Sequence, residues 1–247
     1  MRYFLEVGYK GTKYSGFQVQ QNANSIQGEV ERALSVILRQ SVALTGSSRT
    51  DAGVHALQNF FHFDLAAALN EKTVYNLNAL LPHDIVVRSV FPVPASAHCR
   101  FLATSRHYKY YITTTKDPFN SDTAWYYPFS VDVELLQKVS GVLYHHRDYT
   151  SFAKRNSNVF THECTITKSE WLFENNMLIY SVQANRFLRG MVRGLVGTML
   201  LVGRNKISTA GFEEILQSHD CTRANFATPA HGLFLTKVNF PKSLISL

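Results

Sequence analysis

Alternating apolar and polar positions predict strands in both halves of the chain. In "RYFLEVGY", Tyr3, Leu5 and Val7 recur at every second position, as in a half-buried strand. Further strands are predicted, in chain order, at "SVALTG", "ALQNFFHFD", "DIVVRSVFPV", "HYKYYITTT" and "GLFLTKVNF". The segment "ECTITKSEWLFENNMLIYSVQAN" predicts a hairpin that turns at Asn175 and Asn176, because asparagine tolerates the backbone conformation of a tight turn.

Apolar residues at helical spacing predict the helices. The first should begin near Asn24, with Gln27 three residues on as its capping-box partner. Others are expected at "VYNLNALL", which stops at Pro82, at "VDVELLQKVSGVLY" and at "STAGFEEILQS". A helix over residues 187–202, with Gly203 as its C-terminal stop, carries the longest apolar face: Phe187, Leu188, Met191, Val192, Leu195, Val196, Met199 and Leu200.

The pattern of strands and helices restarts near residue 100, in a stretch rich in Pro, Ala and Ser. We therefore expect an α+β fold made of two α+β halves, residues 1–100 and 101–247, with mainly antiparallel sheets backed by helices. The 45% hydrophobic and 17% charged composition is that of a globular protein. The net charge of +7 suits a polyanion such as RNA, although many proteins without such a partner are equally basic.

The cysteines and the apolar segments indicate a soluble cytoplasmic protein. Cys99, Cys164 and Cys221 lie far apart, which argues against a disulfide framework and against a thiolate metal site. The N-terminus lacks the pattern of a signal peptide. The most apolar window, residues 187–203, contains Arg189 and Arg193 and is too short and too charged to span a membrane.

The loop "SSRTDAGVH" places Arg49, Asp51 and His55 around one glycine, Gly53. An arginine within a few ångströms keeps a partly buried aspartate ionised, and such a carboxylate can act as a nucleophile or a base. The structural alternative is a turn aspartate bonded to its own backbone, with the arginine in solvent. A histidine such as His55, taken alone, more often packs or accepts a hydrogen bond than catalyses.

Two other segments combine cations with residues suited to RNA. Arg186, Arg189 and Arg193 are spaced to share one face of the predicted helix, and glycines at similar spacing allow close approach of a backbone or a phosphate. The alternative is a solvated basic face with tight helix–sheet packing. In "SRHYKYYI", cations alternate with tyrosines that could stack on bases or simply form a half-buried strand: Arg106, His107, Lys109, Tyr108, Tyr110 and Tyr111.

Motifs for metals and nucleotide cofactors are absent from the sequence. There is no H-E-x-x-H, no C-x-x-C and no zinc deaminase signature, and the adjacent His145 and His146 would point apart on a helix. Neither G-x-G-x-x-G nor a P-loop is present. We therefore expect no metal and no nucleotide cofactor.

Taken together, the segments resemble the tRNA pseudouridine synthases of the TruA type. "RTDAGVHA" matches the catalytic motif of that family, and "GFQVQ…SIQG", "RFLATSRHYKYYI", "NRFLRGMVRGLVGTML" and "HGLFL" resemble its other signature segments in the same order. The resemblance runs from about residue 2 to 239. Ser48 departs from the common Gly and Phe17 from the common Trp, which leaves the details of RNA contact open.

The resemblance implies an enzyme that isomerises uridine to pseudouridine in tRNA without metal or cofactor. The base is cut from its ribose and rejoined through carbon. Family members act at positions 38–40 of the anticodon stem-loop and work as homodimers in which one tRNA touches both subunits. A central cleft is expected, with Asp51 as the catalytic carboxylate, Tyr108 as the active-site tyrosine and Arg193 as the partner of Asp51.

The roles implied by the resemblance agree with elementary chemistry. The target uridine must leave its stack, which costs a few kcal/mol. Arg49 could fill the vacated space or hold a phosphate, and Tyr108 could stack on the base and move a proton. Whether Asp51 attacks C1′ or removes a proton is left open. The expected RNA contacts are Arg49, His55, Arg106, Lys109, Arg186 and Arg189.

Two other functions compete with this one. A non-catalytic RNA-binding module would keep the basic and aromatic segments but would not need Asp51 with nearby arginines. A hydrolase using Asp51 with His55 or His62 is disfavoured, because no metal set and no Ser or Cys nucleophile loop accompanies them.

Overall fold

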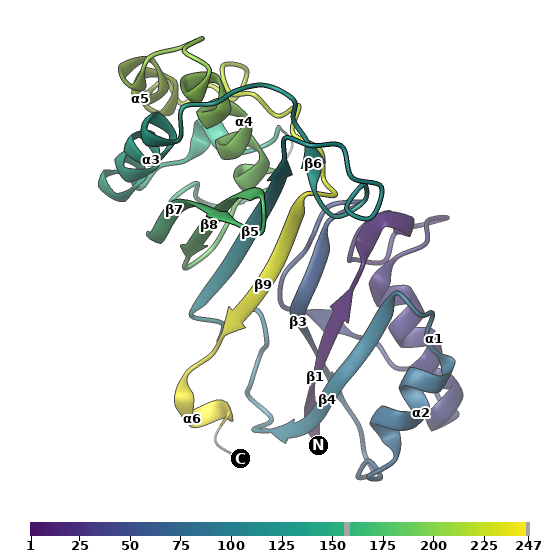
Figure 1. Ribbon diagram of the computed structural model, residues 1–247. Coiled ribbons are helices and arrows are strands. Elements are labelled where there is room, and N and C mark those ends of the chain that lie inside the picture. Colours follow the sequence, from purple (N-terminus) through teal and green to yellow (C-terminus); the bar gives the residue numbers. More distant parts are fainter. Residues whose placement is uncertain (156–158, 246–247) are drawn as a thin grey trace. The chain divides into compact units, whose positions relative to one another are not determined.

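The computed structural model describes residues 1–155 and 159–245, which form two compact units (Figure 1). The first unit contains Met1–Thr104 and Phe234–Leu247, and the second contains Ser105–Leu233. The sequence-based division near residue 100 assigned the C-terminal strand to the second half, whereas the structure places most of this strand in the first unit. Strand β9 (Leu233–Asn239) pairs in parallel with β3 (His55–Asp64), so most of that strand belongs with the N-terminal elements.

In the first unit the strands follow the order β4-β1-β3-β9. Strand β1 (Arg2–Tyr9) lies between β3 and β4 (Ile85–Val93) and is antiparallel to both, with Leu5 opposite Phe61 and Val90. The predicted strands at these positions are confirmed. Strand β2 (Thr45–Gly46) pairs with β3 but is much shorter than the predicted "SVALTG". The β3–β9 pair is parallel, so the sheet is mostly rather than wholly antiparallel.

Helix α1 (Ile26–Leu38) begins after Ser25, whose side chain accepts a hydrogen bond from the backbone N–H of Gly28. Gln27 is not its capping-box partner, which corrects the sequence-based assignment. The Gln27 amide instead donates to the carbonyl of Leu44 at 2.9 Å and ties the helix to the chain before β2. Helix α1 packs on α2 (Thr73–Leu80), which packs on β4 (Figure 1). A 3₁₀ helix at Gly11–Lys13 and the four-residue helix α6 (Lys242–Ile245) also belong to this unit (Figure 1).

In the second unit β8 (Met177–Ala184) lies between β5 (Ser105–Thr113) and β7 (Ile166–Glu174), antiparallel to both. The predicted hairpin is confirmed, since Asn175 and Asn176 join β7 to β8 with φ of 51° and 61°. The two-residue strand β6 (Trp125–Tyr126) pairs in parallel with β5.

Helices α3 (Val133–Val142), α4 (Met191–Gly203) and α5 (Thr209–Gln217) pack on one another in the second unit (Figure 1). Short 3₁₀ turns lie at Leu143–His145 and Thr150–Phe152. Helix α4 begins at Met191 rather than at 187, because Gly190 precedes it with a left-handed φ of 73° that ends any continuous helix. Its last residue is Gly203, and Arg204 caps it. Among the described residues, no helix is long and apolar enough to cross a membrane.

Candidate active site

The "SSRTDAGVH" loop lies on a layer of buried polar side chains in the first unit. The hydroxyls of Thr50 and Tyr9 are 2.8 Å apart and hydrogen-bonded. The Asn59 amide, which is fully buried, donates to the carbonyl of Ser48 at 2.8 Å and to the Tyr9 hydroxyl at 3.2 Å. Buried polar groups are stable only when they are paired, so this network fixes the backbone on the N-terminal side of Asp51.

The backbone of the loop also packs directly against the backbone at Gly16. The N–H of Phe17 donates to the carbonyl of Thr50 at 3.1 Å, and a Cβ placed at Gly16 would lie 3.1 Å from that same carbonyl. On the other side of Asp51, the N–H of Val54 donates to the Asp51 carbonyl at 3.1 Å. Asp51, half-buried, is therefore held between two fixed backbone positions.

His55 packs inside the first unit. It is 1% exposed, its Nδ1 accepts a hydrogen bond from the N–H of Gly11 at 3.0 Å, and its ring stacks on Phe234 at a centroid distance of 4.5 Å. These contacts give His55 a packing role in the first unit, which disfavours the RNA contact expected of it. Arg49, by contrast, is exposed.

Strand β5 carries Arg106, Tyr108 and Tyr110 on one face and Lys109 on the other, because side chains alternate along a strand. Tyr108 is buried and meets the ring of Phe187 edge-on at 5.0 Å. Arg106 donates from Nη1 to the carbonyl of Asn185 at 2.8 Å. The strand thus presents a mixed aromatic and cationic face, not one tyrosine face and one cationic face.

Arg193 lies in the first turn of α4 and is fixed by Thr228. Its Nε donates to the Thr228 carbonyl at 2.7 Å, and the Thr228 hydroxyl donates back to the Arg193 carbonyl at 2.8 Å. Thr228 is 1% exposed. Because both bonds are partly buried, the position of Arg193 depends on the segment around residue 228.

The glycines of α4 bring that segment close to the helix. A Cβ at Gly194 would lie 2.8 Å from the ring of Phe226, and one at Gly197 would lie 2.3 Å from the carbonyl of Asn225. The same segment reaches β5, where the Tyr110 hydroxyl donates to the Pro229 carbonyl at 2.7 Å. Residues 225–229 therefore link α4 to the tyrosine strand.

Sequence reasoning missed residues 225–229 as a support of the site. The spacing of Gly194 and Gly197 was the available signal, since small residues on a helix indicate a close neighbour. That signal does not identify the neighbour, which lies about 30 residues further along the chain.

Arg186 and Arg189 do not share a helix face with Arg193, and this prediction was wrong. Both precede α4, with Arg186 after β8 and Arg189 in the turn before Gly190. The carbonyl of Arg189 accepts a hydrogen bond from the N–H of Lys154 at 2.9 Å. The three arginines occupy three different local structures, so helical spacing does not gather them.

His62, one of the two histidines named in the hydrolase alternative, is engaged with Cys99 in the first unit. His62 lies seven residues beyond His55 on β3, which is roughly 23 Å along a strand. Its Nδ1 is 3.2 Å from Sγ of Cys99, and burial, helped by nearby cationic groups, lowers the pKa of His62 to about 4. Across residues 1–155 and 159–245, no three His, Cys, Asp or Glu side chains gather in a way that could hold a metal ion.

Comparison with known proteins agrees with these features. A family model described as tRNA pseudouridine synthase matches residues 7–102 and 145–241. A protein of Porphyromonas gingivalis named tRNA pseudouridine synthase A is 43% identical over 252 residues, covering 98% of each chain. Proteins of the same name from Parabacteroides distasonis and Bacteroides thetaiotaomicron are 41% and 42% identical, covering 98% and 99% of this chain and 97% and 93% of theirs.

The matched residues include the "RTDAGVH" loop and the Arg193 helix, and the identities extend over almost the whole chain. The chain therefore belongs to the tRNA pseudouridine synthase family.

Proposed function

We propose that this enzyme isomerises uridine to pseudouridine at positions 38–40 of the tRNA anticodon stem-loop, with Asp51 as its catalytic carboxylate. The observation that carries the proposal is the fixed backbone of the family motif at Asp51. Buried hydrogen bonds at Ser48 and Thr50 hold the residues before it, and the Val54 N–H holds the residues after it. A preorganised carboxylate contributes to catalysis without having to be ordered during the reaction.

The reaction begins when the target uridine leaves its stack and enters a central cleft. The glycosidic bond between N1 and C1′ breaks, the base turns, and a carbon of the base joins C1′. That carbon loses its proton and N1 gains one, so the product is an isomer of the substrate. Asp51 either attacks C1′ or removes a proton, and both routes use an ionised carboxylate at this position.

Tyr108 and Arg193 complete the proposed catalytic set. The Tyr108 ring, held against Phe187, can stack on the extracted base, and its hydroxyl can move a proton. Arg193, fixed by Thr228, can keep Asp51 charged by standing beside it during catalysis.

Arg49, Arg106, Lys109, Arg186 and Arg189 are the proposed contacts to the RNA backbone. Each arginine or lysine that neutralises a phosphate releases counterions and makes binding dependent on salt. The proposed enzyme acts in the cytoplasm as a homodimer and uses neither metal nor organic cofactor.

The test uses purified protein and unmodified tRNA transcripts with uridines at positions 38, 39 and 40, with a chelator present. Pseudouridine is mapped chemically at single-nucleotide resolution. Conversion confined to the anticodon arm and unaffected by chelator is expected. Tight, salt-dependent tRNA binding without any conversion would support the RNA-binding module instead.

A further inference from the structure

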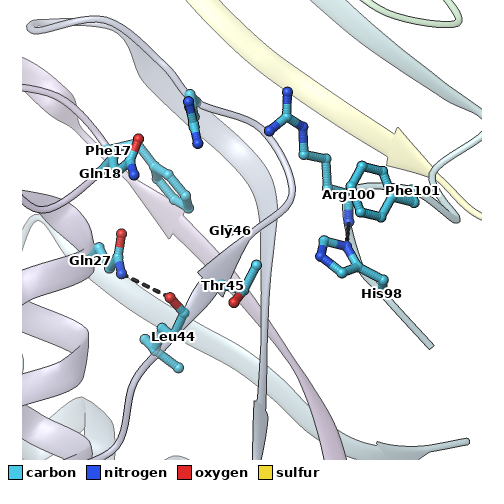
Figure 2. Close-up of a pocket in the computed structure, with 10 residues that line it drawn as sticks. Phe17, Gln18, Gln27, Leu44, Thr45, Gly46, His98, Arg100 and Phe101 are labelled. Atoms are coloured by element: carbon cyan, nitrogen blue, oxygen red, sulfur yellow. Dashed lines mark hydrogen bonds between the residues drawn. The ribbon is translucent and has the colours of Figure 1, made fainter. Parts of the chain in front are cut away.

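The first unit contains a pocket of about 200 Å³ beside the "SSRTDAGVH" loop. Figure 2 shows His98, Arg100 and Phe101 on one side and Phe17, Gln27 and Leu44 on the other. Gln18, Thr45, Gly46 and Arg49 complete the lining. Sites for drug-sized ligands have volumes of roughly 300–1,000 Å³, so this pocket suits a single planar group better than a whole small molecule.

One wall of the pocket is rigid. Phe17 is 1% exposed and stacks on Phe61 at a centroid distance of 4.5 Å. A Cβ at Gly46 would lie 2.3 Å from the Phe17 ring, so only a glycine lets β2 pass this close. The Gln27 amide donates to the carbonyl of Leu44 at 2.9 Å, and both residues line the pocket (Figure 2). This wall is therefore held in place by packing within the first unit.

The opposite wall presents an aromatic surface and a hydrogen-bond donor. The rings of His98 and Phe101 lie 4.1 Å apart at 32°, and Phe101 is 76% exposed. The Nδ1 of His98 accepts a hydrogen bond from the N–H of Arg100 at 3.2 Å, so the neutral ring carries its proton on Nε2. Burial and nearby arginines lower the pKa of His98, which favours this neutral form.

Two arginines give the pocket its charge. Arg49 and Arg100 both line it and both are exposed. Aromatic faces that stack on bases, combined with arginines that bind phosphates, are typical of surfaces for single-stranded RNA. A purely apolar cavity would not require the cations, and a simple anion site would not require an exposed phenylalanine.

The pocket lies close to Asp51 along the chain. Arg49 precedes Asp51 by two residues, which span at most about 7 Å. A nucleotide held at Arg49 is therefore near the nucleotide that reacts at Asp51.

We propose that this pocket binds one nucleotide immediately flanking the isomerised uridine, with its base on Phe101 and His98 and its phosphate at Arg49 and Arg100. The proposal rests on the proposed function, because it places the reacting uridine at Asp51. It assigns part of the RNA specificity to a surface of the first unit alone.

The test is a double-mutant cycle on RNA binding. Anticodon stem-loop RNA with uridine at position 39 is prepared intact and with an abasic nucleotide at position 38 or 40. Dissociation constants are measured by fluorescence anisotropy for the wild type and for Phe101→Ala. Loss of one stacked base weakens binding about tenfold. At one of the two flanking positions, the abasic change should weaken wild-type binding about tenfold and Phe101→Ala binding hardly at all.

Matched variants separate the pocket from general effects. Tyr75→Ala removes a side chain of the same 76% exposure from α2 and should leave every dissociation constant unchanged. Phe101→Trp keeps a stacking face and should restore the sensitivity to the abasic nucleotide. Arg100→Gln should reduce the salt dependence of binding by about one phosphate contact, whereas Arg88→Gln on β4 should not.

Independent, multiplicative effects of Phe101→Ala and of the abasic change at both positions would overturn the proposal. The cycle is also run in an Asp51→Asn background, where isomerisation is expected to be at least about 10³-fold slower. If the effects of Phe101→Ala and of the abasic nucleotide on the dissociation constant are coupled but the wild type forms no pseudouridine, the proposed function is overturned and the nucleotide pocket is supported. Pseudouridine formation without coupling would overturn the pocket alone.

Discussion

Two segments of the molecule combine arginines with glycines, and they are held in place by different means. The "SSRTDAGVH" loop is held by hydrogen bonds to two polar side chains, Tyr9 of β1 and Asn59 of β3. The segment around Arg193 is held by residues that lie about 30 positions later in the sequence, through the hydrogen bond to Thr228 and the close contact at Gly197.

Neither motif is self-sufficient, but their supports come from different places. In the loop, residues 49–55 carry the proposed chemistry, and one local bond, from the N–H of Val54 to the carbonyl of Asp51, is joined by bonds to Tyr9, Phe17 and Asn59. Around Arg193, the local sequence supplies the charge and the small residues, but a distant segment supplies the contact. Substitutions in the two segments should therefore fail in different ways.

The largest effect among these substitutions is expected at Arg193. Arg193→Lys keeps the charge but loses the planar guanidinium that donates to the carbonyl of Thr228, so under the proposed function the cation would no longer be held where it is proposed to stabilise Asp51. We expect kcat to fall about 100-fold or more, with tRNA affinity changed only a few-fold. Single-turnover pseudouridine formation at saturating enzyme measures this.

Arg189→Lys is the matched change outside the helix. It should keep kcat within a few-fold of the wild type, because Arg189 lies before Gly190 and engages the chain through its backbone. Equal losses in the two variants would contradict the distinct role given to Arg193.

The next effect concerns the glycine contact. Gly197→Ala places a Cβ 2.3 Å from the Asn225 carbonyl, so residues 225–228 must move away from α4. We expect a loss of about 1–3 kcal/mol in the free energy of unfolding, together with a lower kcat because Thr228 moves with them. Thermal and denaturant unfolding measure the stability.

Gly141→Ala in α3 is the control for helix propensity. Apart from its chain neighbours and the backbone of α3, none of the described residues lies within 4 Å of a Cβ there, so this change should stabilise the protein by about 0.5–1 kcal/mol. If both glycine variants were stabilising, residues 225–228 would not depend on close approach at Gly197.

A smaller effect on stability and rate is expected when the hydrogen bond between Thr50 and Tyr9 is removed. Thr50→Val removes the hydroxyl bonded to Tyr9 while keeping the shape of the side chain. Tyr9 retains its bond from Asn59, so the cost should be about 1 kcal/mol in stability. The catalytic rate should fall about tenfold, because Thr50 adjoins Asp51. An unchanged rate in a measurably destabilised variant would show that the network does not position the carboxylate.

Features encoded within a few residues were predicted from the sequence. The turn at Asn175 and Asn176 follows from the left-handed tendency of asparagine, and β1, β3, β5 and β9 follow from their apolar patterns. The start of α4 was not predicted, because Phe187 and Leu188 fit the helical spacing and only the backbone at Gly190 ends it.

Features that depend on contacts between residues far apart in the sequence were not predictable in the same way. The placement of β9 in the first unit depends on its pairing with β3. An apolar pattern predicts a strand but does not predict which strand it pairs with. Gln27 resembled a capping residue, yet its amide bonds Leu44. The proposed catalytic residues Asp51, Tyr108 and Arg193 come from the resemblance of the sequence to a family. The hydrogen bonds from Asn59 and to Thr228 were not foreseen, because they join residues that no local pattern connects.

The most direct measurement compares Asp51→Asn with Asp64→Asn on unmodified tRNA, by mapping pseudouridine at each uridine of the anticodon arm. Asp64 is an exposed carboxylate of the same unit that pairs with Arg2 at 2.7 Å. We predict that Asp51→Asn lowers the rate by at least about 10³-fold, with tRNA affinity and melting temperature kept, while Asp64→Asn remains active. Pseudouridine formation by Asp51→Asn at the wild-type rate would contradict the assignment of Asp51 as the catalytic carboxylate.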